Sequence, residues 1–461
     1  MSTELGYSGK VKTVSTTFSK QSCLNTMDPI GKKLRISQRT ATEEQKTISF
    51  TVAEELGRGS QGVVYKVLSS NGETLALKAY PKEYIDRDHK LEERIKELVY
   101  IGSPHRSFLW PREFLELTDG ENTLKGYTMP IRAKRFISST QLMSGELEVD
   151  FCSLVAACKN LAEAFFHLHT HGLCYKDLSF GNFFFDASNG DCIICDVDNI
   201  CYSGEGGGVL GTPGFMAPEI VTGQQRPSAS SDLHSLAVLI FYMLYIHHPL
   251  EGKTEASIRI MDDIARRKIY GTDALYIFDP RDKRNRPDPI IHSNALMMDE
   301  ILPKKLKKVF EKAFVNGLTD TNQRVVESEW QLVLDDVLNT LGHCSKCGQE
   351  VFLDNFFPGE IFRCWSCQHS QYPLVLVKDE AKTLVRPGAK IKDTYSNIIG
   401  KVIRHPQEKK LLGLKNESNE VWSAIKANGT RTDVMPGKSV VLGPGVAIEA
   451  GSSKMTIEQD H

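Results

Sequence analysis

Apolar positions in the first part of the chain alternate as in strands and then recur at helical spacing. Between residues 49 and 80, apolar and polar residues alternate in short segments, which predicts neighbouring strands joined by turns. The next segment carries apolar residues three or four positions apart, which predicts a helix with one buried face. The strands are expected at Phe50–Leu56, Val63–Val67 and Leu75–Ala79, and the helix at Lys90–Ile101.

Farther along, the pattern becomes mainly helical and then changes again. The longest apolar run, Leu236 to Ile246, has eleven residues, whereas a membrane span needs about 20. This run therefore predicts a core helix, and we expect no membrane association. Beyond residue 370, short apolar runs are interrupted by Gly, Pro and Asn, and Asn428-Gly429 is typical of a hairpin turn. This last part is expected to be a small β domain.

These changes divide the 461 residues into four parts, within the two to four domains that the length suggests. Residues 1–48 are rich in Ser and Thr and are expected to be a flexible arm, in which Val11 to Phe18 could add an edge strand. Residues 49–340 form the main domain, residues 343–370 carry a spaced set of cysteines, and residues 371–461 form the β domain.

Composition narrows the class of protein. Apolar residues make up 41% and charged residues 25%, which is the balance of a globular chain. A net charge of −2 gives no electrostatic footprint for wholesale nucleic-acid binding. The N-terminus has no export-signal pattern, so we expect a reducing, cytoplasmic location. Seven scattered cysteines are then expected to be buried free thiols.

A glycine-rich hairpin is the first candidate site. Its glycines are Gly57, Gly59 and Gly62, with Val64 two positions on, and the strands on both sides exclude a dinucleotide fold. By itself a structural hairpin is an equally good interpretation. Lys78 favours a nucleotide site, because a lysine within an apolar strand needs an anionic partner. ATP phosphates and Glu97 would supply it, although Glu97 could also be a solvated surface charge.

This arrangement resembles the N-lobe of a eukaryotic-type protein kinase, and further motifs agree. Tyr175-Lys-Asp177-Leu-Ser-Phe-Gly-Asn182 resembles the kinase catalytic loop, and Asp196 ends a strand nineteen residues after Asp177. The resemblance implies that Asp177 orients the acceptor hydroxyl, that Asn182 and Asp196 hold Mg²⁺ (or Mn²⁺), and that Lys78 positions the ATP phosphates. It also implies an adenine slot beside Met129, as gatekeeper, and Ile131.

Downstream residues extend the resemblance over residues 49–340, with an N-lobe at 49–129 and a C-lobe at 130–340. Gly211-Thr-Pro-Gly-Phe-Met-Ala-Pro-Glu219 is similar to the end of a Ser/Thr kinase activation segment, which places Thr212 in the substrate-facing loop. Structural roles are implied for three residues: Glu219 would pair with Arg324, and Asp232 would cap the catalytic-loop backbone.

Some positions depart from that pattern. Lys176 replaces the catalytic-loop arginine that grips a phosphorylated activation loop, and a lysine cannot form that bidentate fork. Ser179 replaces the lysine that steadies the γ-phosphate. Asp-Phe-Gly becomes Asp196-Val197-Asp198, which keeps the metal-binding carboxylate but loses the hinge glycine, so a flip of this motif is not expected.

The spaced cysteines form two C-x-x-C pairs, Cys344 with Cys347 and Cys364 with Cys367. Thiolates at this spacing bind one structural Zn²⁺, which predicts a zinc ribbon; redox pairs or buried thiols are the alternative. Few basic residues lie inside the set, so it favours protein contacts over nucleic acid. The β tail is expected to be a sandwich-like packing or interaction module.

The fold class expected is α+β: a bilobal protein kinase followed by a zinc ribbon and a small all-β domain. This architecture resembles bacterial kinases of tellurium-resistance-type gene clusters, whose partners include a von Willebrand A-type protein and a metal-dependent Ser/Thr phosphatase. The expected function is ATP- and Mg²⁺-dependent phosphorylation of Ser/Thr hydroxyls in protein substrates. The alternatives are a nucleotide-binding pseudokinase scaffold and a nucleic-acid adaptor centred on the ribbon.

Overall fold

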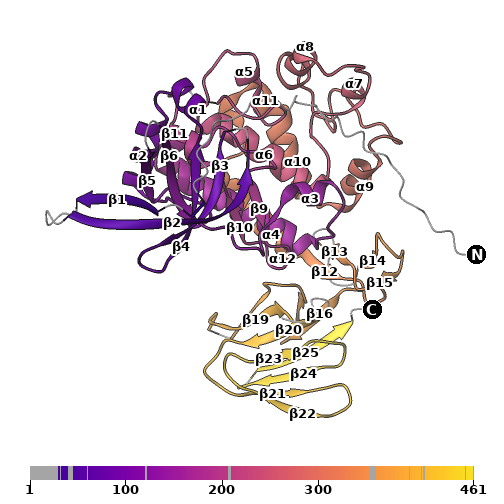
Figure 1. The fold of residues 1–461 in the computed structure, drawn as a ribbon. Helices are drawn as coiled ribbons and strands as arrows, with labels where there is room; N and C mark the ends of the chain where they lie inside the picture. Colours follow the sequence, from indigo (N-terminus) through magenta and orange to yellow (C-terminus); the bar gives the residue numbers. More distant parts are fainter. Residues whose placement is uncertain are drawn as a thin grey trace, which may run out of the picture.

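The chain folds into a two-lobed body with a β domain attached below it (Figure 1). The computed structural model describes residues 30–31, 33–39, 45–59, 61–119, 122–205, 209–353, 360–393, 395–405, 408, 411–451 and 453–459. The expected edge strand at Val11 to Phe18 and Cys23 lie outside these residues. The division into a strand-rich lobe, a helical lobe and a C-terminal β region confirms the predicted fold class.

A six-stranded antiparallel sheet forms the N-lobe, drawn in indigo in Figure 1, with the order β1-β2-β3-β4-β6-β5. The sheet begins earlier than expected, because residues 33–39 and 45–48 of the predicted flexible arm pair as β1 and the start of β2. The elements are β1 (Lys33–Arg39), β2 (Gln45–Arg58), β3 (Val63–Ser69), β4 (Thr74–Tyr80), α1 (Lys82–Arg87), α2 (Leu91–Ile101), β5 (Glu113–Asp119) and β6 (Asn122–Pro130).

Helix α2 packs its apolar face on this sheet, as the spacing predicted. Leu91, Ile95 and Leu98 are at most 2% exposed, and they fall on one face because the helix turns once every 3.6 residues. Gly102, with φ of 77°, ends the helix by donating its N–H to the carbonyl of Leu98. The apolar face fixes which side of α2 turns toward the cleft between the lobes.

Helices build the C-lobe around α6, which is buried on nearly all sides. A capping box of Ser228 and Ser231 starts α6, and its apolar run packs against aromatic residues of the surrounding helices, so the run Leu236 to Ile246 is core, as predicted. The helices are α3 (Ser139–Met143), α4 (Phe151–Thr170), α5 (Pro218–Val221), α6 (Ala229–Tyr245), α7 (Lys253–Ala256), α8 (Asp263–Arg267), α9 (Ser293–Ile301), α10 (Lys304–Glu311), α11 (Gly317–Thr319) and α12 (Glu327–Thr340).

Short strands and turns of the C-lobe carry the loops nearest the N-lobe. Strand β9 pairs with β7 and β10, and β8 pairs with β11. These elements are β7 (Ile137–Ser138), β8 (Leu173–Cys174), β9 (Phe183–Phe185), β10 (Cys192–Ile194), η1 (Val197–Asn199), β11 (Cys201–Tyr202), η2 (Lys268–Thr272), η3 (Lys312–Asn316) and η4 (Thr321–Gln323).

The remaining chain forms two small hairpins and then two sheets that enclose one apolar core, so the tail is a β-sandwich. The predicted turn at Asn428-Gly429 joins β21 to β22, and Gly429 has φ of 81°. The strands are β12 (Leu341–His343), β13 (Glu350–Phe352), β14 (Phe362–Arg363), β15 (Ser370–Gln371), β16 (Leu374–Lys378), β17 (Ala381–Leu384), β18 (Lys390–Lys392), β19 (Ile398–Arg404), β20 (Leu412–Asn416), β21 (Trp422–Ile425), β22 (Arg431–Val434), β23 (Ser439–Val441), β24 (Ala447–Ala450) and β25 (Ser453–Gln459).

The first small hairpin packs directly on helix α4 of the C-lobe. The rings of Phe352 and Phe151 lie 5.0 Å apart. Glu350 accepts a hydrogen bond from the Cys152 N–H at 3.1 Å and pairs with Arg404 of the sandwich at 3.0 Å. Glu350 therefore connects the helical lobe, the cysteine module and the sandwich at one point.

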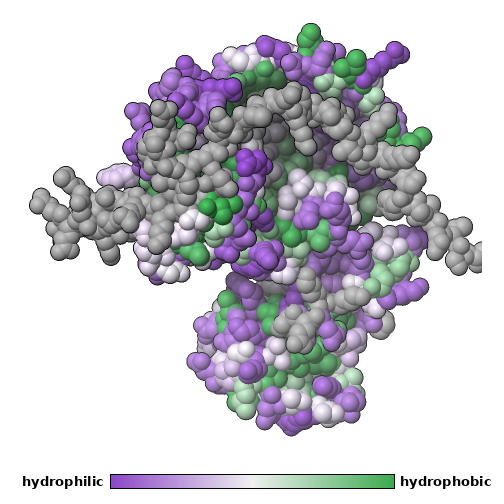
Figure 2. Space-filling model, viewed as in Figure 1, coloured by the Kyte–Doolittle hydropathy of each residue, from purple (hydrophilic) through white to green (hydrophobic). Residues whose placement is uncertain are grey.

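The surface shows no hydrophobic belt among the coloured residues of the face drawn in Figure 2, where hydrophilic and hydrophobic side chains are interspersed over both the larger body and the β domain. Among the described residues, no helix combines the length and the apolar character that a membrane span needs. The eleven-residue apolar run is accounted for by the core of the C-lobe.

Candidate active site and cysteine cluster

The loop between β8 and β9 presents Asp177 and Asn182 toward the N-lobe. The Asn182 amide donates to the carbonyl of Asp177 at 2.8 Å, which closes the loop on itself. Oδ1 of Asp177 accepts a hydrogen bond of 2.6 Å from the Thr212 hydroxyl. Burial raises the pKa of Asp177, the Thr212 hydrogen bond lowers it, and the nearby Asp196 carboxylate raises it, with a net increase. The loop thus holds a carboxylate of increased basicity next to the activation segment.

Asp232 of α6 fixes the backbone of this loop, as predicted. Its two carboxylate oxygens accept the backbone N–H groups of Tyr175 and of Lys176, the latter at 2.9 Å. Lys176 has φ of 72°, a conformation that costs energy for a residue with a Cβ. Nε2 of His169 lies 3.2 Å from Oδ2 of Asp232, the oxygen that also accepts the Tyr175 N–H. A buried carboxylate on the core helix therefore holds the strained loop in place.

Lys78 lies on β4 and is 4% exposed, and its carboxylate partners come from the segment after β10. Nζ of Lys78 is 3.1 Å from Asp196 Oδ1 and 2.8 Å from Asp198 Oδ2. Burial by itself would lower the pKa of Lys78, but the attraction of Asp198 and Asp196 outweighs burial and raises it. The predicted meeting of Lys78 and Asp196 is therefore present, and the lysine is charged.

The expectation that Glu97 holds Lys78 is wrong. Glu97 is exposed on α2 and lines a surface pocket with Lys90, Glu93 and Lys176, away from the lysine of β4. The α2 residue that reaches the site is Arg94, whose Nε donates to the carbonyl of Asp198 at 2.6 Å. The spacing of apolar residues predicted the buried face of α2, but it did not predict which polar residue of this helix reaches the cleft.

The glycine-rich hairpin joins β2 to β3, as predicted, and Val64 lies opposite Lys78 in the register of β3 and β4. Gly62 is required by packing, because a Cβ there would lie 2.3 Å from the carbonyl oxygen of Ala79. A Cβ at Gly57 or Gly59 would meet no protein atom within 4 Å. Packing within the chain thus explains Gly62 and does not by itself require glycine at Gly57 or Gly59.

The proposed adenine slot lies at the end of β6. Met129 is 7% exposed and pairs with Ala76 in the sheet, two residues before Lys78 along β4. Ile131 follows the strand and is 37% exposed. Met129 thus belongs to the N-lobe core, while Ile131 lies at the lobe boundary.

The predicted pair of Glu219 and Arg324 is present and buried. The Arg324 guanidinium donates to both carboxylate oxygens of Glu219, at 2.8 and 2.7 Å, and also to the Ser230 carbonyl at 2.8 Å. A bidentate pair of this kind fixes orientation as well as distance. It ties the end of the activation segment to the start of α6 and to the loop before α12.

The four spaced cysteines converge on one point between the two small hairpins. All four sulfur atoms lie within 4.8 Å of one another, with Cys344 and Cys367 at 3.6 Å and Cys347 and Cys364 at 3.7 Å. Zn–S bonds of about 2.3 Å in tetrahedral geometry place sulfur atoms about 3.8 Å apart. Gly348, directly after the first pair, has φ of 73°, which suits a tight turn there. The four sulfurs fit one tetrahedral zinc ion.

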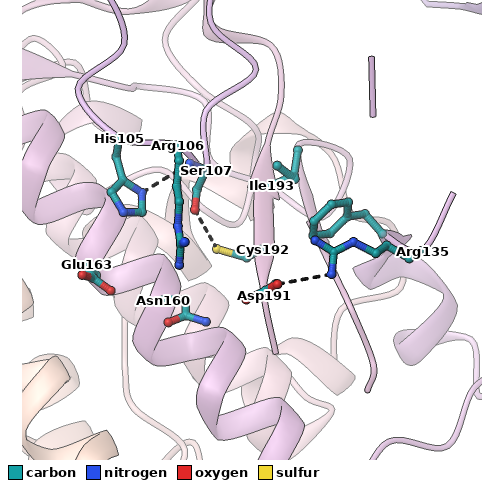
Figure 3. A pocket seen from close by; sticks show the side chains of 10 residues that line it. His105, Arg106, Ser107, Arg135, Asn160, Glu163, Asp191, Cys192 and Ile193 are labelled. Carbon is teal, nitrogen blue, oxygen red and sulfur yellow. Dashed lines mark hydrogen bonds and ion pairs between the residues drawn. The ribbon is translucent and has the colours of Figure 1, made fainter. Parts of the chain in front are cut away.

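A separate cavity of about 220 Å³ is lined in part by Cys192 and Ile193 of β10 (Figure 3). Arg135 pairs with Asp191 at its edge, and Ser107 accepts a hydrogen bond from the Cys192 thiol. His105 and Glu163 also line it. None of the residues predicted to handle phosphate lines this cavity, so it is distinct from the site around Lys78.

Sequence reasoning missed the roles of Asp198, Arg94 and His169. The sequence did contain a hint of the role of Asp198, because this acidic residue occupies the position at which the resembled kinase motif has glycine. Arg94 and His169 had no comparable signal, because their contacts come from distant segments. Beside the cysteine cluster, His343 lies half-buried and hydrogen-bonded to Arg404 at 3.1 Å.

A sheet-based N-lobe, a helical C-lobe and a lysine that meets carboxylates between them define a kinase-like fold and site. The comparison with known families agrees: the protein kinase domain matches residues 50–312, and the chain belongs to that family. The family implies ATP and a divalent metal ion.

Curated relatives are similar at low identity. They include protein kinase C of Drosophila melanogaster (27% identical over 53% of this chain and 33% of the relative), the probable serine/threonine-protein kinase zyg-1 of Caenorhabditis briggsae (29%, 44% and 28%) and CBL-interacting protein kinase 30 of Oryza sativa subsp. japonica (24%, 45% and 44%). The chain covers less than half of each of these relatives. The similarity thus concerns the kinase domain.

Proposed function

We propose that this protein kinase transfers the γ-phosphoryl group of ATP, with Mg²⁺ or Mn²⁺, to Ser and Thr hydroxyls of protein substrates. One observation carries the proposal: Lys78, Asp177, Asn182 and Asp196, scattered over more than a hundred positions, lie at one junction between the lobes. Asp196 contacts Lys78, and its neighbour Cys195 donates its N–H to the Asn182 carbonyl at 2.9 Å. Phosphoryl transfer depends mainly on such positioning and on charge stabilisation.

The residues divide the work as follows. Asp177 accepts the proton of the acceptor hydroxyl, and its raised pKa favours that role. Asn182 and Asp196 offer oxygen ligands for a hard divalent cation. Lys78 contacts the phosphates beneath Gly57, Gly59 and Gly62. ATP bound here supplies the phosphoryl group, and Mg²⁺ neutralises its charge.

The activation segment supports transfer to Ser and Thr. Thr212 donates to Asp177, so the segment is held against the catalytic carboxylate. Next to it lies a groove of about 520 Å³ lined by Pro213, Met216, Arg266 and Tyr270, among others. A protein segment lying in this groove would bring its hydroxyl toward Asp177. The relatives named as serine/threonine kinases add to this proposal.

The test is incubation of the full chain with γ-labelled ATP and Mg²⁺, followed by analysis of the phosphorylated amino acids. Asp177→Asn is expected to lower transfer at least about 100-fold, because a positioned acid–base group contributes about 10²–10⁴. Asp335→Asn, on the exposed face of α12, is the matched control and is expected to keep full activity. Wild-type protein that binds ATP without transferring phosphate would instead support the scaffold alternative, and label on tyrosine alone would contradict the Ser/Thr proposal.

We also propose that the cysteine cluster holds one structural Zn²⁺, with no open coordination position, and that the ribbon and sandwich serve in docking of partners or substrates. The contacts of Glu350 with the C-lobe and with Arg404 support a module fixed in orientation. The von Willebrand A-type protein, the metal-dependent phosphatase, the bacterial affiliation and the cytoplasmic location stay predictions from the resemblance.

A further inference from the structure

Asp198 is a fully buried carboxylate two residues after Asp196, in the turn η1. Its side chain is 1% exposed, and the hydroxyl of Tyr80 and the ammonium group of Lys78 both donate to its Oδ2. A buried charge is costly unless it is paired and hydrogen-bonded. Asp198 is therefore a buried, hydrogen-bonded acidic partner of Lys78 in the core of the cleft.

The two acidic partners of Lys78 differ in their access to solvent. The Asp196 side chain is 40% exposed, whereas that of Asp198 is 1% exposed. The separation from Nζ is also shorter for Asp198, at 2.8 Å against 3.1 Å for Asp196. Asp196 can therefore turn its oxygens toward a cation in the cleft while Asp198 keeps its contact with Lys78. Oε1 of Gln61 accepts a further hydrogen bond from Nζ of Lys78 at 3.1 Å.

Helix α2 contributes a cation to this site in place of a carboxylate. Arg94 donates from Nε to the carbonyl oxygen of Asp198 at 2.6 Å and pairs through its other end with Asp88 at 2.7 Å. Glu97 is exposed and lines a surface pocket beside Arg94, and the hydrogen bonds of Lys78 go to Gln61, Asp196 and Asp198 instead. Asp198, the buried acid that pairs with Lys78, thus comes from the same turn as the proposed metal ligand Asp196. Helix α2 contributes only the hydrogen bond of Arg94 to that turn.

We propose that Asp198 is the positioning residue that holds Lys78 for contact with the ATP phosphates, a role for which no carboxylate of α2 is needed. This inference rests on the proposed function of Lys78 as the phosphate-binding lysine. Because Asp196 and Asp198 belong to one short turn, the metal ligand and the lysine partner are set together. Alignment of the lysine therefore does not depend on where α2 places a glutamate.

The test compares Asp198→Asn with the matched control Glu97→Gln, which makes the same acid-to-amide change on α2. Affinities for MgATP and for adenosine are measured by calorimetry, together with the thermal midpoint. Asp198→Asn is expected to weaken MgATP binding about 10- to 100-fold, as for loss of a charge-assisted hydrogen bond. Adenosine affinity is expected to stay within about twofold, because the nucleoside lacks the phosphates that Lys78 contacts. Glu97→Gln is expected to bind both ligands as the wild type does.

A second variant moves the carboxylate to the helix. In Asp198→Gly/Arg94→Glu, an acid on α2 replaces the acid of the turn, and this double variant is expected to recover at least tenfold of the MgATP affinity that Asp198→Gly loses. Equal MgATP affinity in Asp198→Asn and wild type would overturn the inference, as would an equal loss of MgATP and adenosine affinity, or a loss caused by Glu97→Gln.

Measurement of MgATP affinity distinguishes failure of this inference from failure of the proposed kinase function. If wild-type protein binds MgATP but transfers no phosphate, the kinase proposal fails, and the affinity of Asp198→Asn still decides the role of Asp198. If wild type transfers phosphate and Asp198→Asn keeps its affinity, only the inference about Asp198 fails. Wild-type protein that binds no MgATP would overturn both.

Discussion

Stability of the kinase domain should fall as pH rises from about 6.5 to 9, because of His169. This histidine, near the end of α4, lies between Asp232 of α6 and Glu327 of α12 and contacts both carboxylates. Burial by itself lowers the pKa of His169, but the hydrogen bonds to Asp232 and Glu327 outweigh burial and raise the pKa from 6.5 to about 9. At neutral pH the ring is therefore protonated and donates to both acids.

The direction and the size of this change in unfolding free energy follow from the linkage between protonation of His169 and folding. The folded protein binds this proton more tightly than the unfolded chain, so the stabilisation is fully present below pH 6.5 and is lost as pH rises through about 9. At about 1.4 kcal/mol per pH unit, this interval corresponds to about 3 kcal/mol of unfolding free energy. Since Asp232 also anchors the backbone at Lys176, deprotonation of His169 is expected to loosen the catalytic loop first.

The assay is urea unfolding of wild type and His169→Gln at four pH values between 6 and 9.5, followed by fluorescence. Subtracting the variant from the wild type removes the contribution of other titrating groups. The stability difference is expected to be largest at pH 6 and to shrink by about 3 kcal/mol by pH 9.5. His171→Gln, on the exposed end of the same helix, should show no such trend. A wild-type-minus-His169→Gln difference that stays constant over this range would refute the reasoning.

Three further changes probe the fold. Arg324→Met is expected to destabilise the domain by about 3–5 kcal/mol, because Glu219 would remain buried without its partner, and thermal unfolding measures this. Cys364→Ser is expected to lower bound zinc from about one per chain to none, measured by elemental analysis, and to unfold the ribbon. Gly62→Ala is expected to lower the free energy of unfolding in urea by about 1–3 kcal/mol, because the added Cβ meets a carbonyl oxygen. Gly59→Ala is expected to cause no such loss, because its Cβ would meet no protein atom.

Controls are available for each of these. Arg226→Met removes an exposed arginine before α6, and a loss of stability as large as that of Arg324→Met would contradict the argument from burial. Cys152→Ser changes a cysteine outside the cluster and should keep its zinc; zinc retained at full level by Cys364→Ser would contradict the four-sulfur site. Equal stability of Gly62→Ala and Gly59→Ala would contradict the packing argument.

Local sequence was sufficient wherever a motif lies within a few residues. The catalytic-loop contact of Asp177 with Asn182 spans five positions, and each C-x-x-C pair of the cysteine cluster lies within four residues. The order of strands and helices followed from apolar spacing, since burial of one face requires it. The buried pair of Glu219 and Arg324 was also predicted, but through resemblance to a family and not through local chemistry.

Contacts between distant segments depended on the tertiary structure. Lys78 required an acid, and the sequence could state that requirement because an unpaired buried charge is too costly. It could not select Asp198 over Glu97, because that choice depends on how α2 tilts and on how η1 turns after β10. The links from Glu350 to α4 and to Arg404 likewise arise from docking of separate modules. The sequence by itself determined which groups need partners and which faces are buried; the packing of whole elements decided which partner each group meets.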